Sequence, residues 1–174
     1  MRETPSQTAG PYLHIGMLPE QAGVAYRPLG SNTLTGAGTP IVIEGRVLDG
    51  IGAPCRDMVI ELWQADADGH YGGVFRGWAR SGTDFATGVF RFTTIRPGAT
   101  AGAPFVSLWL AARGLNIGLQ TRMYFPNEPR NDADPVLSRV EPLRRPTLIA
   151  GAEAGRFVFD IHLQGPQETV FFDV

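Results

Sequence analysis

Apolar and polar side chains alternate along several short stretches of the chain after residue 40. In residues 157–164 the odd positions read Phe, Phe, Ile and Leu, while the even positions read Val, Asp, His and Gln. Because successive side chains of a strand point to opposite faces, this period of two predicts β-strands. Strands of this kind are predicted over residues 40–48, 88–94 and 157–164, and further strands over residues 58–65 and 117–125.

The remaining segments carry different or weaker patterns. Residues 104–112 are nearly all apolar and predict a strand buried on both faces. Residues 134–140 favour one or two helical turns, with Pro135 in the first helical position. Residues 147–150 are weakly strand-like, and residues 169–174 predict a final edge strand. About eight short strands between Gly- and Pro-rich turns indicate an all-β sandwich or barrel with at most one short helix.

The first 39 residues lack this periodicity. They are rich in Pro, Gly, Thr and Ser, so by themselves they cannot bury enough apolar surface to fold. We therefore expect an irregular N-terminal arm over residues 1–39, lying on its own domain or on a partner. Residues 40–174 are expected to form a single β domain, in keeping with a chain of 174 residues.

Composition narrows the classes of partner. Only 18% of the residues are charged, which suggests a surface covered by another chain, although a large β core explains the figure equally well. All fifteen basic residues are arginines, and with a net charge of −2 they form no basic stripe for nucleic acid. The single Cys55 forbids an internal disulfide and fits a reducing compartment. With no signal-peptide pattern and no membrane-length apolar run, a soluble cytoplasmic protein is expected.

Several segments that could suggest a calcium site or a catalytic nucleophile are better explained as ordinary structural residues. The turn at residues 66–69 has acidic residues two apart and a glycine, but it lacks the downstream Glu of a calcium loop. Cys55 has no histidine near it in sequence, so a bystander thiol is expected. Ser81 and Ser107 lack the nucleophile-elbow pattern.

Four segments carry a specific resemblance. They read ELWQADADGHY (61–71), RFTTIRPG (91–98), SLWLAARG (107–114) and QTRMYF (120–125). Together they resemble the core of the intradiol ring-cleaving dioxygenases, whose fold is a mixed β-sandwich. Iron-binding members offer two tyrosines and two histidines to Fe(III), a hard cation suited to phenolate oxygen. Here Tyr71 falls on the first tyrosine position, whereas the other three read Thr100, Phe105 and Ser107. The resemblance therefore implies that this chain binds no metal and that Fe(III) belongs to a partner.

Further segments are similar to the noncatalytic α chains of heteromeric members. These are the run TPSQTAGPYLHIG (4–16), the Ala112-Arg113-Gly114 turn and the ending ETVFF (168–172). In such α chains the matching residues line the cavity of the adjoining β chain, which implies that role for Thr8, Gly10, Pro11 and Arg113. From the residues alone, a surface arginine in a hairpin and an arm packed on its own domain remain open.

The resemblance also implies an activity. The β partner would use O2 to cleave protocatechuate, an aromatic carboxylate, to 3-carboxy-cis,cis-muconate, within a higher-order αβ assembly. The α chain would complete the wall of the cavity. The alternative is a non-enzymatic binding or scaffold module that uses the same β-sandwich fold. Phe105, where related α chains keep a polar residue, argues against ligand binding in the lost metal pocket itself.

Overall fold

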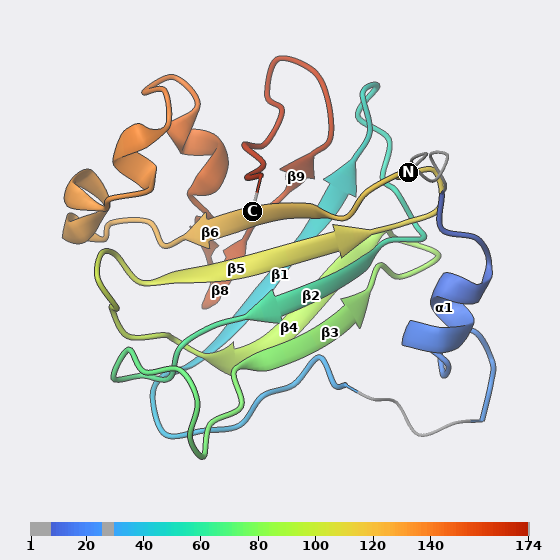
Figure 1. Cartoon of the computed structure of the whole chain (residues 1–174), viewed down its shortest axis with the longest axis horizontal. Helices are drawn as coiled ribbons and strands as arrows, with labels where there is room; N and C mark the ends of the chain where they lie inside the picture. Colours follow the sequence, from blue (N-terminus) through green and yellow to red (C-terminus); the bar gives the residue numbers. More distant parts are fainter. Residues whose placement is uncertain (1–7, 26–29, 174) are drawn as a thin grey trace, which may run out of the picture.

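The computed structural model describes residues 8–25 and 30–173, in which two β-sheets pack face to face (Figure 1). One sheet has the strand order β4-β1-β8-β7, with β9 also paired to β1, and the other has the order β3-β2-β5-β6. The elements are α1 (Tyr12–Met17), β1 (Pro40–Leu48), β2 (Val59–Trp63), β3 (Trp78–Gly82), β4 (Val89–Ile95), β5 (Phe105–Ala111), β6 (Leu119–Tyr124), β7 (Gly151–Glu153), β8 (Arg156–Val158) and β9 (Ile161–His162), with 3-10 helices η1 (Pro129–Ala133), η2 (Leu137–Arg139) and η3 (Arg145–Leu148).

The mixed β-sandwich is confirmed. Strand β1 pairs antiparallel with β4 and parallel with β8 and β9, so the first sheet is mixed. The alternation that predicted β1 is seen in its burial, since Ile41, Ile43 and Val47 all point into the core. There they meet apolar side chains of both sheets, among them Phe90 and Leu108.

Strands β3 and β7 were missed, and the burial of β5 was overestimated. Strand β3 gave no apolar alternation because its inward positions are the small residues Ala79 and Ser81. The prediction that residues 104–112 are buried on both faces is wrong within the described chain. Strand β5 buries only every second side chain up to Leu110, and Phe105, Ser107 and Trp109 are partly exposed on the outer face. That face is where the candidate site lies.

The C-terminal predictions need correction. The strand predicted over residues 157–164 is split into β8 and β9, because the Asp160 carboxylate accepts a hydrogen bond from the Arg46 N–H at 2.8 Å. Of residues 147–150, Thr147 and Leu148 belong to η3, and Ile149 forms an isolated parallel bridge with Tyr124 rather than a strand. Residues 169–173 form no regular strand, although the Phe172 N–H donates to the carbonyl of Gln120.

The helical turn predicted within residues 134–140 is present as the 3-10 helix η2, although Pro135 lies before it. The Asp134 side chain accepts hydrogen bonds from the N–H groups of Val136 and Leu137 at the start of η2. The α-helix of the described chain is α1, inside the arm predicted to be irregular. None of the helices in the ranges described is long and apolar enough to cross a membrane.

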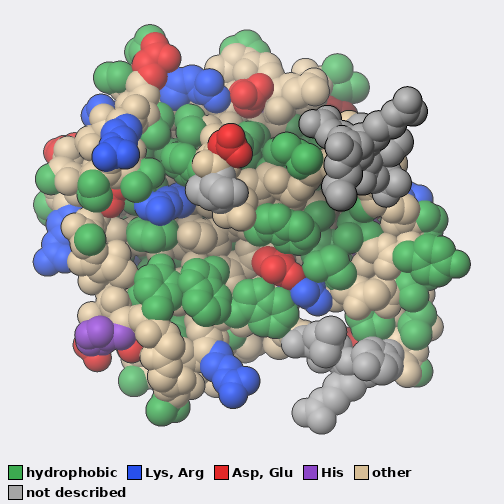
Figure 2. Space-filling view, in the orientation of Figure 1, with side chains coloured by type: hydrophobic (Ala, Val, Ile, Leu, Met, Phe, Trp, Pro, Cys, Tyr) green, Lys and Arg blue, Asp and Glu red, His purple; other side chains and the backbone are tan. Residues whose placement is uncertain are grey.

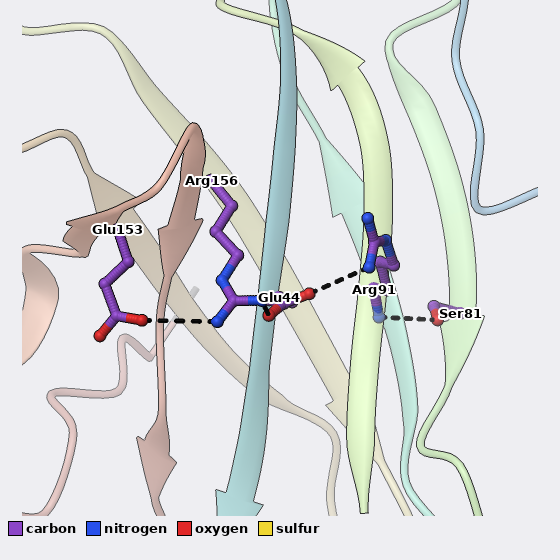
Figure 3. A network of polar contacts seen from close by, with 5 residues as sticks. All are labelled: Glu44, Ser81, Arg91, Glu153 and Arg156. Carbon is purple, nitrogen blue, oxygen red and sulfur yellow. Dashed lines mark hydrogen bonds and ion pairs between the residues drawn. The ribbon is translucent and has the colours of Figure 1, made fainter.

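An ion network covers the outer face of the first sheet (Figure 3). Glu44 on β1 lies between Arg156 at 2.7 Å and Arg91 at 3.3 Å, and its side chain is only 14% exposed. Arg156 also contacts Glu153 at 3.5 Å. One carboxylate therefore separates two guanidinium groups that would otherwise repel each other.

We expect Glu44→Gln to lower the free energy of unfolding by about 1–2 kcal/mol, because it leaves both arginines without their shared partner and both are about half exposed. Urea titration followed by circular dichroism measures the loss, which added salt should reduce. The matched control is Glu153→Gln, whose pair is solvent-exposed and should cost under about 0.5 kcal/mol. Equal losses in the two variants would contradict the central role of Glu44.

Candidate functional site

The structure brings the N-terminal arm to the turn that follows β5. Ala9 forms a parallel bridge with Arg113, and the Thr8 hydroxyl accepts a hydrogen bond of 2.6 Å from the Gly114 N–H. The same hydroxyl lies 3.4 Å from the carbonyl of Leu115. Thus Thr8 and Arg113, two of the predicted cavity residues, lie together although about a hundred positions separate them in sequence.

The other two predicted residues follow at once along the arm. Gly10 is exposed and has open space where a side chain would stand, and the exposed Pro11 sits at the N-terminal end of α1. The part of the similar N-terminal run that precedes Thr8 lies outside the described residues.

The guanidinium of Arg113 is oriented by a carboxylate. Its Nε donates to Oδ2 of Asp57 at 3.1 Å, and the arginine side chain is 56% exposed. Nε is the donor of this bond, and no hydrogen bond within the described residues engages the two terminal amino groups. A planar guanidinium held in this way can offer two parallel hydrogen bonds to an incoming carboxylate.

His14 lies near this pair and was not singled out from the sequence. Its ring is buried, packs 5.8 Å from the ring of Phe85, and its Nε2 has no hydrogen-bond partner within the described residues. Burial lowers the pKa of His14 from its ordinary 6.5, the Asp57 charge opposes this and the Arg113 charge adds to it. The neutral imidazole is therefore the form that the fold favours.

We expect stability to fall as pH drops below 6.5. Below pH 6.5 the unfolded chain binds a proton at His14, whereas the folded chain does not until the pH reaches the lowered pKa of His14. The stabilisation present above pH 6.5 is therefore lost as the pH falls toward that lowered pKa. Tm measured from pH 8 to pH 5 reports the loss. His14→Phe keeps the contact with Phe85 and should flatten the curve in this window; an unchanged curve would assign the effect to other groups.

Three of the four positions matched to iron ligands lie on the outer face of the second sheet. Tyr71 stacks on Trp63 with ring centroids 5.8 Å apart, and Trp63 faces Ser107 across the β2–β5 pair. Phe105 lies two residues before Ser107 on the same face of β5. Thr100, the fourth, is exposed in the loop before β5, and no described hydrogen bond ties its side chain to the others.

The side chains at these positions do not fit Fe(III). Phe105 has no donor atom, Ser107 and Thr100 offer neutral hydroxyls, and burial raises the pKa of the Tyr71 phenol so that its neutral form is favoured. Within the described ranges, no group of three or more His, Cys, Asp or Glu side chains could hold a metal. No step of a reaction is therefore assigned to a metal on this chain.

Sequence reasoning overlooked Arg122, which shares this face. In the β5–β6 register Arg122 stands directly opposite Ser107, and its guanidinium carbon lies 4.1 Å from the centre of the Phe105 ring. The signal was available, because alternation along β6 places Arg122 and the buried Met123 on opposite faces.

The same face carries all three tryptophans of the chain. Trp63 pairs with Trp78 across β2–β3, and Trp109 pairs with Glu61 across β2–β5. They line a hollow of about 490 Å³ together with Met17, and Trp63 is 46% exposed. In Figure 2 hydrophobic side chains lie side by side across this side of the molecule. We call the outer face formed by Trp63, Trp78 and Trp109 the tryptophan face.

Comparison with known proteins defines the class. A family profile described as "Dioxygenase" matches residues 16–165. The chain belongs to this dioxygenase family. It is 44% identical to the protocatechuate 3,4-dioxygenase alpha chain of Pseudomonas putida, with 98% of this chain and 96% of that protein covered. It is 38% identical to the Burkholderia cepacia alpha chain, with 100% and 98% covered. Within the family, the chain therefore belongs with the alpha chains of protocatechuate 3,4-dioxygenase.

Other matches agree with this placement. The Burkholderia cepacia beta chain of the same enzyme is 34% identical over 76% of this chain and 67% of its own length. Among solved structures, a dioxygenase domain from Streptomyces sp. SirexAA-E superposes with a TM-score of 0.64 at 25% identity, covering 97% of this chain and all of that one. Hydroxyquinol 1,2-dioxygenase from Pseudomonas putida, at 18% identity and a TM-score of 0.61, covers 86% of this chain and 71% of its own and supports the fold.

Proposed function

We propose that this chain is the noncatalytic alpha subunit of a protocatechuate 3,4-dioxygenase, and that it completes the active-site cavity of a beta subunit that carries the Fe(III). The observation that carries the proposal is that the chain matches alpha chains along its whole length while only Tyr71 remains at the ligand positions. The reaction, O2-dependent cleavage of protocatechuate to 3-carboxy-cis,cis-muconate, would then take place on the partner.

Arg113 is the residue through which this chain would meet the substrate. Protocatechuate is a carboxylate, and a half-exposed guanidinium with its terminal amino groups free of the Asp57 bond suits an anion entering from a neighbouring chain. Its positive charge would also raise the rate at which an anionic substrate reaches the cleft. Thr8, Gly10 and Pro11 would form the adjoining wall, since the arm is hydrogen-bonded to the Arg113 turn.

The tryptophan face and the arm are the surfaces that a beta subunit would cover. Exposed contiguous aromatic surface is unusual on a protein that remains alone, and tryptophan is enriched where partner chains meet. Trp63, Tyr71 and Tyr12 are 46%, 42% and 80% exposed, which supports an obligate partner over a solitary scaffold.

Co-expression with an iron-competent beta chain tests the proposal. We expect the two chains to elute together from a sizing column, with one iron per αβ pair, red-brown colour and protocatechuate-dependent O2 uptake. The alpha chain expressed alone should be colourless. A colourless monomer that ignores the beta chain would favour the scaffold alternative, and a coloured isolated alpha chain would overturn the assignment of iron to the partner.

A further inference from the structure

Arg122 lies beside Phe105 and Ser107, two of the positions that match the lost metal site. Its guanidinium carbon is 4.1 Å from the centre of the Phe105 ring and 5.9 Å from that of Phe172, so aromatic rings flank the cation. On β5 its cross-strand neighbour is Ser107. The side chain is partly buried, and this fixes the charge in place rather than leaving it in bulk water.

No carboxylate neutralises this charge within the described chain. The polar contact of the guanidinium is Nη1 at 3.4 Å from the hydroxyl oxygen of Tyr124, a neutral group. The carboxylate beyond it, Asp134, accepts from that hydroxyl at 3.0 Å and from three backbone N–H groups instead. By contrast, Arg80 on the same face is paired with Glu61 at 2.6 Å. Arg122 is thus a half-buried cation facing Ser107 without a counter-ion.

The charge of Arg122 acts on Tyr71, the side chain that still matches an iron ligand. Tyr71 stacks on Trp63, which is next to Ser107 in the same cross-strand row as Arg122. The positive charge of Arg122 partly offsets the rise that burial causes in the pKa of Tyr71. A metal ion bound beside Tyr71 and β5 would therefore have to approach a fixed guanidinium.

We propose that Arg122 is a built-in replacement for the charge of the metal, and that it bars cations from this face of the chain. Two features then prevent a metal from binding: the missing donor atoms and the charge of Arg122. Like charges at short range in a partly buried site repel strongly, so donors added around Arg122 would not suffice to hold a cation. Removing the guanidinium would be the step that reopens the site. The inference does not depend on the role proposed for Arg113.

Three sets of substitutions separate the effects of donors and charge. Phe105→His with Ser107→His adds two imidazoles on the face that Tyr71 shares, and the same pair combined with Arg122→Gln also removes the charge. A third set combines the two histidines with Arg122→Lys, which keeps a cation of another shape. Circular dichroism and Tm of each full-length variant check that it folds.

Each variant is titrated with Fe(III) citrate, first as the isolated alpha chain and then in complex with the beta chain. For the complex, the iron bound by the unsubstituted complex is subtracted from the iron measured. We expect only the Arg122→Gln set to gain about one iron per chain, with a visible tyrosinate band that Tyr71→Phe abolishes, and at least a tenfold weaker affinity in the other two sets. Arg130→Gln in place of Arg122→Gln is the matched control and should gain none. Equal iron binding with and without Arg122, or no gain in any set of folded variants, would overturn the proposal.

Discussion

Replacing Arg113 by alanine in the assembled αβ enzyme is expected to reduce kcat/KM for protocatechuate by about 10- to 100-fold, mainly through KM, without removing iron. A charge-assisted hydrogen-bonded pair contributes roughly 1.5–3 kcal/mol, and each 1.4 kcal/mol corresponds to a factor of ten. Because Arg113 lies on a chain whose side chains do not fit the metal, its loss should leave the chemical centre intact. Steady-state O2 uptake and iron analysis of the same preparation measure both quantities.

Three comparisons show whether the carboxylate of the substrate is what Arg113 meets. Catechol, which lacks that carboxylate, should be turned over equally by the parent enzyme and by Arg113→Ala. Arg113→Lys should recover only part of the loss, because an ammonium group cannot form the two parallel bonds. Asp57→Asn should raise KM less than Arg113→Ala does. The double variant should have the KM of Arg113→Ala, since Asp57 would act only by orienting Nε of Arg113. Parent kinetics for Arg113→Ala on protocatechuate would remove Arg113 from the site.

The sandwich could be predicted from the sequence because its longest strands each bury one clear apolar stripe. Ile41, Ile43 and Val47 on β1 are an example, and β4 shows the same alternation with Phe90 and Phe92. Strand β3 has no such stripe and is held by pairing with β2, a tertiary contact that local pattern does not encode. The break between β8 and β9 likewise depends on the Asp160 side chain bonding to the backbone of β1.

Part of the candidate site could likewise be predicted from the sequence, and part depends on tertiary contacts. The resemblance named Tyr71, Phe105 and Ser107, and their spacing of two residues on a predicted strand was enough to place Phe105 and Ser107 on one face. It could not show that the Thr8 hydroxyl meets the N–H of Gly114, because the two residues are about a hundred positions apart. Arg122 was missed since a single arginine on a strand resembles any solvent-facing cation, and only the register against β5 shows what it faces.

Asp134→Ala is expected to lower the free energy of unfolding by about 3 kcal/mol or more. The Asp134 side chain is 2% exposed and its two oxygens accept from the N–H groups of Ala103, Val136 and Leu137 and from the Tyr124 hydroxyl, at 2.8–3.0 Å. Alanine would leave these buried donors without an acceptor and open a space at the end of β6.

Two control variants show whether the loss comes from the hydrogen bonds of Asp134 rather than from removing any carboxylate in this segment. Asp132 lies in the neighbouring 3-10 helix and is exposed, so Asp132→Ala should cost under about 0.5 kcal/mol. Tyr124→Phe removes one donor and leaves the carboxylate three backbone partners, so about 1 kcal/mol is expected. Burial raises the pKa of Tyr124 to about 12, so its hydroxyl stays a donor at any pH used for urea titration. If Asp134→Ala unfolds no more readily than Asp132→Ala, the segment after β6 is held by its apolar contacts with Leu137 and Leu148 rather than by this carboxylate.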